Sequence, residues 1–190
     1  MHLNSYNEIH PNRRFTRKYL LTVCALAILA VPVFGQELKW TSFKEPNLKF
    51  ALLFPGDPVA NPPDVKKRDD GSVESTGYYF LTGTASSYVS LAGATDYNFT
   101  VNAESELTAD RDNFVKAING KATNSRRYEF LAGDEKLPAL SFNVENDSRV
   151  GKAIVVVRGN RAYMVVFVYQ KGQDYAAAMD KFLESFEITK

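Results

Sequence analysis

The sequence predicts an α+β fold in which an antiparallel β-sheet is sandwiched between helices in a single domain. A long apolar stretch at residues 151–169 is interrupted by a turn and reads as a β-hairpin covered on both faces. Two amphipathic segments, residues 103–118 and 174–186, can each cover one face of a sheet. At 190 residues the chain has room for one hydrophobic core, and neither a linker nor an internal repeat divides it after residue 35.

The first 35 residues have the pattern of a secretory signal peptide. A basic cluster at residues 13–18 precedes an apolar run at residues 19–31, which is shorter than the roughly 20 residues that span a bilayer as a helix. Cleavage after Gly35 would leave Gln36 at the new amino terminus. The expected location is secreted or periplasmic. The alternative is a retained leader, which would be the protein's membrane contact.

Removal of this leader changes the chemistry that the chain can perform. His2, His10 and Cys24 all lie within it, so the remaining chain has no histidine and no cysteine. The leader also takes 4 of the 23 basic residues and 1 of the 22 acidic ones, which leaves 19 and 21 and a net charge of about −2. Nucleic acid is therefore not an expected partner. Without a disulfide, stability must come from core packing.

A chain without histidine and cysteine lacks the usual catalytic triads, thiol nucleophiles and zinc ligands. It contains neither a GxxxxGK[ST] phosphate loop nor a GxGxxG motif. Asp110 and Asp112 imitate the start of a calcium loop, but Phe114 occupies the next ligand position. We therefore predict no enzyme activity, no catalytic residue, no metal site and no cofactor. A pair of carboxylates, as in glycoside hydrolysis, is the alternative that the composition still permits.

The amino-terminal part of the domain reads as two strands and an exposed loop. Residues 38–43 alternate in polarity, and residues 48–54 form an apolar run that the sequence Pro-Gly-Asp-Pro ends at residues 55–58. Residues 60–71 carry prolines and charges of both signs, so we expect a solvated loop there rather than a basic contact patch.

Two aromatic strands and a helix follow. Strands are expected at residues 77–82 and 87–97. Helical spacing begins at residue 103, with Asn102 as the amino-terminal cap, and ends at Asn119 and Gly120. The aromatic side chains either line a ligand groove or are ordinary sheet residues half covered by a helix. They are Tyr78, Tyr79, Phe80, Tyr88, Tyr97 and Phe99.

The carboxyl-terminal part completes the sheet. Strands are expected at residues 125–131 and 139–144, with a turn at residues 132–138 between them. Five arginines are expected along one edge of the sheet, where they either attract an anionic partner or prevent edge-to-edge aggregation. They are Arg126, Arg127, Arg149, Arg158 and Arg161.

The hairpin has a two-residue loop, Gly159 and Asn160, of the kind that suits the mirror-image turns of tight hairpins. Such a loop fixes the register of the two strands. The expected pairs, counted from the turn, are Arg158 with Arg161, Val156 with Tyr163 and Ile154 with Val165.

Short motifs in this order resemble those of the PsbP-like family, which includes the extrinsic photosystem II subunit and many small exported bacterial proteins. The motif residues are Phe50, Phe54, Pro55, Gly56, Pro58, Arg161, Tyr163, Phe182, Leu183, Ser185 and Phe186. The resemblance implies an α/β/α sandwich over residues 36–190 and a non-catalytic binding or accessory role outside the cytoplasm. It implies no metal site, because the metal positions of the photosynthetic members contain histidine.

The function expected from the sequence is that of an exported, non-enzymatic binding or accessory protein. Its expected partner is a protein or a small apolar molecule. The alternatives are a carboxylate-dependent hydrolase and an inert structural component of the cell envelope. The sequence does not assign the ligand-binding residues.

Overall fold

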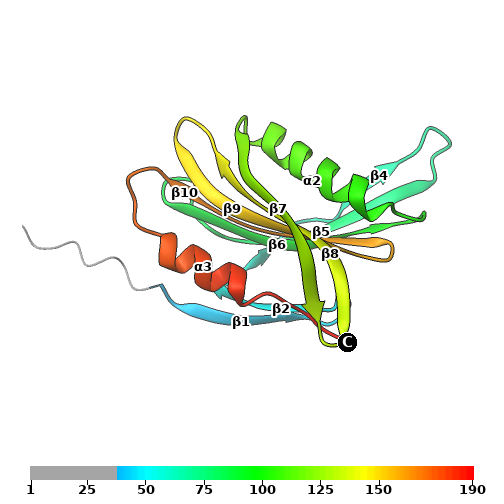
Figure 1. Ribbon diagram of the computed structural model, residues 1–190, viewed down its shortest axis with the longest axis horizontal. Coiled ribbons are helices and arrows are strands. Elements are labelled where there is room, and N and C mark those ends of the chain that lie inside the picture. The colour runs from blue at the N-terminus through cyan, green and yellow to red at the C-terminus, as the bar shows by residue number, and fades with distance from the viewer. Residues whose placement is uncertain (1–37) are drawn as a thin grey trace, which may run out of the picture. The chain divides into compact units, whose positions relative to one another are not determined.

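An eight-stranded antiparallel sheet is the centre of the computed structural model, which describes residues 38–190 (Figure 1). The predicted signal peptide, residues 1–35, and the two residues that follow it lie outside the described residues. In spatial order the strands are β3 (Val59–Ala60), β5 (Val73–Gly83), β6 (Tyr88–Tyr97), β10 (Arg161–Gln170), β9 (Arg149–Arg158), β8 (Glu135–Glu145) and β7 (Lys121–Ala132), and β4 (Asp64–Lys67) pairs with another part of β5.

The β9–β10 hairpin lies at the middle of this sheet and has the predicted register. β10 pairs with β6 on its other side and β9 pairs with β8, so both strands are interior. Gly159 has a φ of 60°, a conformation that glycine adopts readily. The confirmed pairs are Arg158 with Arg161, Val156 with Tyr163 and Ile154 with Val165.

The helix α2 (Ala103–Ala117) covers one face of the large sheet (Figure 1). Its predicted cap is confirmed, because the Asn102 side chain accepts a hydrogen bond from the Ser105 N–H at 3.0 Å. At the other end Asn119 has a φ of 50°, and the Gly120 N–H donates to the Val115 carbonyl at 2.9 Å. This is a Schellman ending, with asparagine in the left-handed position.

The opposite face is covered by a second helix and a second, smaller sheet. The helix α3 (Ala176–Glu184) lies beside a three-stranded sheet in the order β1 (Trp40–Glu45), β2 (Phe50–Pro55) and β11 (Glu187–Ile188). The rings of Phe54 on β2 and Phe182 on α3 pack with centroids 5.3 Å apart. The predicted arrangement of a sheet between helices is confirmed. The contribution of the small sheet to one covering layer was not predicted.

Two predicted loops are partly wrong. Residues 60–71 are exposed as expected, but they include β4, which pairs with the first half of β5. The predicted turn at residues 132–138 shrinks to Gly133 and Asp134, because Gly133 has a φ of 64° and closes a tight hairpin. Pro138 then lies within β8 at a position that pairs with β7, and pairing with β9 begins only at the next residue.

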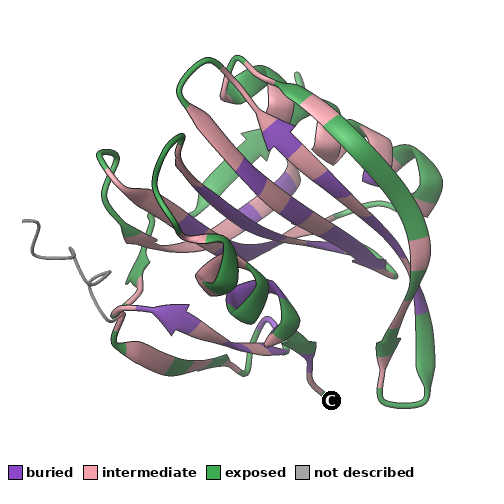
Figure 2. Cartoon of the chain, turned by 60° about the vertical axis from the view of Figure 1, so that its left-hand side comes forward, coloured by how far each residue is buried: buried purple, intermediate pink, exposed green. Residues whose placement is uncertain are grey.

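Hydrophobic side chains fill both interfaces of the large sheet. The strand interiors are buried, whereas the hairpin ends and the outer strand β7 are mainly exposed (Figure 2). One core lies beneath α2 and contains the fully buried Leu107, and the other lies beneath α3 and the small sheet. No helix within residues 38–190 combines the length and apolar character needed to cross a bilayer.

Candidate functional site

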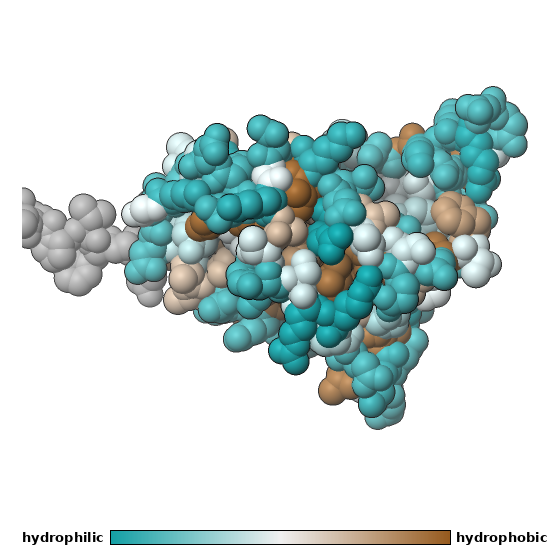
Figure 3. Space-filling model, turned by 45° about the horizontal axis from the view of Figure 1, so that its top comes forward, coloured by the Kyte–Doolittle hydropathy of each residue, from teal (hydrophilic) through white to brown (hydrophobic). Residues whose placement is uncertain are grey.

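A groove of about 460 Å³ lies between α2 and the sheet, where β4, β5 and β6 run beside one another. This face of the molecule is mainly hydrophilic, with apolar side chains visible in small separate patches (Figure 3). The polar and aromatic residues that line the groove are Asp64, Lys66, Ser75, Tyr79, Thr95, Tyr97, Asp110, Asn113 and Phe114.

The floor of the groove is the ring of Tyr79, which lies over two glycines. A Cβ at Gly77, two residues earlier on the same strand, would come within 2.7 Å of the ring, and one at Gly93 on β6 would come within 2.6 Å. The ring therefore occupies space that any other residue at these two positions would fill. Its hydroxyl hydrogen-bonds to Oγ1 of Thr95 at 2.9 Å. Burial raises the pKa of Tyr79, so this hydroxyl stays neutral.

Tyr97 joins the sheet to the helix at the edge of the groove. Its hydroxyl donates a hydrogen bond to Oε1 of Glu106 on α2. Burial and this carboxylate raise the pKa of Tyr97, so the phenol remains a hydrogen-bond donor throughout the physiological pH range. The ring of Phe99 packs on that of Tyr97 with centroids 5.3 Å apart. The hydrogen bond from Tyr97 to Glu106 fixes the position of α2 above the sheet at this end.

Asp110 is a half-buried carboxyl that lines the groove from α2. Burial, and then the charge of Glu106 one helical turn away, raise its pKa to about 7. No lysine or arginine lies within salt-bridge distance of Asp110 in residues 38–190. Near neutral pH its side chain can consequently either accept or donate a hydrogen bond toward a bound molecule.

The six aromatic residues expected near a groove lie on both faces of the sheet. Only Tyr79 and Tyr97 line the groove, and Phe99 is 38% exposed beside it. Alternate residues of a strand point to opposite faces, so the rest are ordinary core residues. Those that pack into the core beneath α3 and the small sheet are Tyr78, Phe80 and Tyr88.

The five arginines expected along one edge are spread over three places. Arg126 and Arg127 lie on the edge strand β7, Arg149 begins β9, and Arg158 and Arg161 flank the hairpin turn. The structure thus contradicts the expectation of a single basic edge, because the antiparallel course of the hairpin places its first arginine at the far end of the sheet.

Sequence reasoning missed the polar wall of the groove. From the sequence, Asp110 is only the start of an incomplete calcium loop, and Asp64 is part of the predicted loop at residues 60–71. Their common position depends on β4 pairing with β5 and on α2 crossing above, and neither arrangement leaves a local signal in the sequence. Residues 38–190 contain no group of three or more acidic side chains placed to hold a metal ion.

No protein-family model matches the chain, and no curated protein sequence matches it. Among solved structures, this chain is similar to the solution structure of cyanobacterial PsbP (CyanoP) from Synechocystis sp. PCC 6803. The TM-score is 0.47 at 10% sequence identity, and the match covers 85% of this chain and 99% of that one. The likeness concerns the fold alone, and it agrees with the PsbP-like fold that the sequence motifs predict.

Proposed function

We propose that this chain is an exported, non-enzymatic binding protein that holds a small molecule in the groove beneath α2. The observation that carries the proposal is the placement of Tyr79 over Gly77 and Gly93. Two strands without side chains at these positions leave one flat aromatic surface at the bottom of an open groove. A volume of about 460 Å³ is within the usual range of small-molecule sites.

The lining residues indicate the chemical character of the ligand. The Tyr79 ring favours a flat apolar face, whereas Asp110 and Asn113 on the helix place hydrogen-bonding groups along one side. The ligand class that fits is a small molecule with an apolar face and polar groups at its edge. The predicted signal peptide supports a location outside the cytoplasm, secreted or periplasmic, and this part of the proposal rests on the sequence.

One observation favours a second candidate function, a carboxylate-dependent hydrolase. Asp64 on β4 and Asp110 on α2 line the same groove, and a carboxyl with a pKa of about 7 suits a general acid. Binding is the better supported function, because the aromatic floor is built into both strands, whereas Asp64 lies on an exposed four-residue strand.

The test is a nuclear magnetic resonance titration of the isotope-labelled protein with mixtures of aromatic compounds, glycans and lipids. We expect saturable amide shifts at Tyr79, Tyr97 and Asn113 for at least one compound. The absence of any such shift, or shifts confined to the opposite face, contradicts a binding site in the groove.

The same experiment separates the two functions. A binding protein returns its ligand unchanged, whereas a hydrolase generates product signals that the Asp110→Asn variant abolishes. Binding that survives in Asp110→Asn without turnover in either protein supports the non-enzymatic role.

A further inference from the structure

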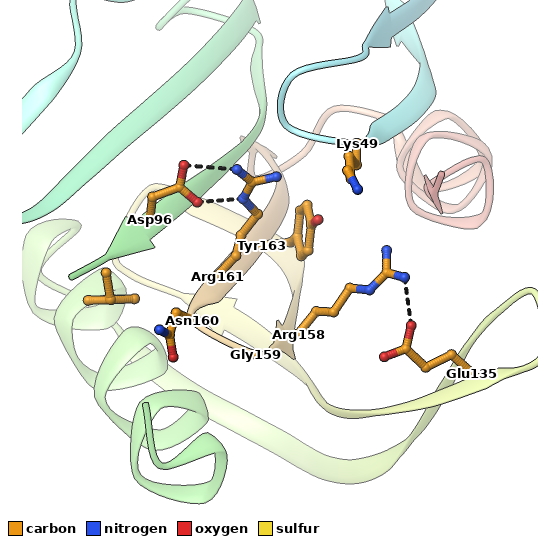
Figure 4. A pocket seen from close by; sticks show the side chains of 9 residues that line it. Lys49, Asp96, Glu135, Arg158, Gly159, Asn160, Arg161 and Tyr163 are labelled. Carbon is orange, nitrogen blue, oxygen red and sulfur yellow. Dashed lines mark hydrogen bonds and ion pairs between the residues drawn. The ribbon is translucent and has the colours of Figure 1, made fainter. Parts of the chain in front are cut away.

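A second depression, of about 550 Å³, lies beside the turn of the β9–β10 hairpin. Side chains from four separate parts of the chain meet there, and Figure 4 shows the basic ones pointing toward a common space around Tyr163. We call it the hairpin pocket and define it by Lys49, Asp96, Glu135, Arg158, Arg161 and Tyr163. It is distinct from the groove beneath α2, although Tyr97 borders both.

Arg161 is held rigidly at one wall of the hairpin pocket. Its guanidinium donates through Nε and a terminal nitrogen to the two oxygens of Asp96, at 2.5 and 2.9 Å, and the other terminal nitrogen donates to the Asn47 carbonyl at 3.2 Å. Asp96 is also its neighbour across the β6–β10 pair. This bidentate contact neutralises the charge of Asp96 and fixes the position of the Arg161 guanidinium.

Arg158 is held at the other wall in a similar way. It pairs with Glu135 at 2.7 Å and donates to the Thr189 carbonyl at 3.3 Å. A guanidinium carries five N–H groups, so these two contacts leave donors of Arg158 available to a further acceptor. Both carboxylates of the pocket are already paired with an arginine, so the two negative charges of the pocket are balanced by two of its positive charges.

Lys49 supplies a third cation. Its backbone has a φ of 58°, a left-handed conformation that is uncommon for lysine, and its carbonyl accepts a hydrogen bond from the Thr189 N–H at 2.8 Å. In residues 38–190 no carboxylate lies within salt-bridge distance of its Nζ. Figure 4 shows the side chain extending toward the pocket. Three cations and two carboxylates leave one positive charge uncompensated.

We propose that the hairpin pocket binds a small oxyanion, a carboxylate or phosphate group, between Nζ of Lys49 and the free N–H groups of Arg158. Arg161 is a positioning residue, because all three of its guanidinium nitrogens already donate to Asp96 or Asn47 and hold it at the wall of the pocket. Oxygen acceptors suit this arrangement, since charge-assisted hydrogen bonds to ammonium and guanidinium groups are stronger than neutral ones. The inference is independent of the function proposed for the groove.

The test is a titration of the full chain with sodium phosphate and, separately, with sodium acetate, at constant ionic strength maintained by sodium chloride. Amide shifts of Lys49, Gly159 and Asn160 report on the pocket. We expect saturable shifts with at least one of the two anions. A response to acetate alone identifies a carboxylate site, and a response to phosphate identifies a site for phosphate groups.

Two variants and a matched control establish the role of the amine. Lys49→Gln and Lys49→Gly should each weaken anion binding about tenfold or more, the loss expected for one charge-assisted hydrogen bond. The glycine variant suits the positive φ, so its loss of binding cannot be assigned to misfolding. Lys116→Gln removes the same charge from an exposed position on α2 and should leave binding unchanged. Unaltered binding in both Lys49 variants, equal weakening in Lys116→Gln, or no saturable shift with either anion would overturn the proposal.

Discussion

The ring of Tyr79 lies against the backbone of Gly93, directly across the β5–β6 pair, where a Cβ would meet the ring at 2.6 Å. This contact matters both for the stability of the sheet and for the shape of the groove. It covers two glycines that would otherwise weaken the sheet, and it presents the opposite surface of the ring to the groove. The same side chain thus contributes to stability and to the proposed binding surface.

A double-mutant cycle tests this packing. The three atoms nearest to a Cβ at Gly77 all belong to the Tyr79 side chain, so Gly77→Ala should cost about 1–3 kcal/mol in the free energy of unfolding and much less when Tyr79 is leucine. Gly93→Ala should remain costly in both backgrounds, because its Cβ would lie 2.2 Å from the Tyr78 carbonyl oxygen. Urea denaturation measures each value. An equal cost of Gly77→Ala in both backgrounds contradicts the proposed stacking.

The raised pKa of Asp110 predicts a specific dependence of stability on pH. A carboxyl whose folded pKa exceeds its unfolded value binds more protons in the folded state, so its contribution falls as pH rises between the two values. Here the window runs from about pH 4 to about pH 7, and the penalty is complete above it.

Asp110→Asn removes this ionisation and should therefore be more stable than the original protein at pH 8, with the advantage shrinking toward pH 4. The size is on the order of a few kcal/mol, from about 1.4 kcal/mol per pKa unit. Thermal denaturation across this range measures it. Asp112→Asn, which removes a carboxylate from an exposed position on the same helix, is the matched control. A difference between Asp110→Asn and the original protein that does not vary with pH would refute the assignment.

The bidentate contact of Arg161 with Asp96 predicts that lysine cannot replace this arginine. Arg161→Lys keeps the charge but loses the paired hydrogen bonds, and we expect a loss of about 1–2 kcal/mol in the free energy of unfolding. Arg126→Lys, on the exposed edge strand, should change stability by less than about 0.5 kcal/mol. Chemical denaturation distinguishes them, and equal stability of the two variants would show that the contact with Asp96 contributes little.

Asn119 supplies a prediction of increased stability. Its φ of 50° at the end of α2 suits glycine better than asparagine, so Asn119→Gly should raise the free energy of unfolding by a few tenths of a kcal/mol to about 1 kcal/mol. Asn119→Ala should lower it by a similar amount, because alanine tolerates the left-handed conformation less well. Opposite signs in urea denaturation are the expected result. A destabilised glycine variant would indicate that the asparagine side chain matters more than its backbone.

The features that local sequence determines were predicted well. The two-residue loop at Gly159 fixed every pair of the central hairpin, and Asn102 and Asn119 marked the ends of α2 as expected. These features depend on residues close together in the chain. The interactions that stabilise them can therefore be recognised from the local sequence.

The features that depend on distant segments were not predicted. β11 consists of two residues that pair with β2 from the other end of the chain, and no local pattern signals so short a strand. The groove likewise requires β4 to pair with β5 and α2 to cross above them. Tyr78 and Tyr79 point to opposite faces because successive residues of a strand alternate. Grouping the aromatic residues by type alone does not reveal this difference.

The most direct test of the proposed binding site compares two neighbouring tyrosines. Any compound that binds in the titration should be measured again with Tyr79→Leu and with Tyr78→Leu, which removes a similar ring from the opposite face of the same strand. The account predicts that affinity falls about tenfold or more in Tyr79→Leu, the order of magnitude expected when one stacking aromatic ring is lost, and stays within about twofold in Tyr78→Leu. Equal affinity of the two variants would contradict the claim that the groove over Tyr79 is the binding site.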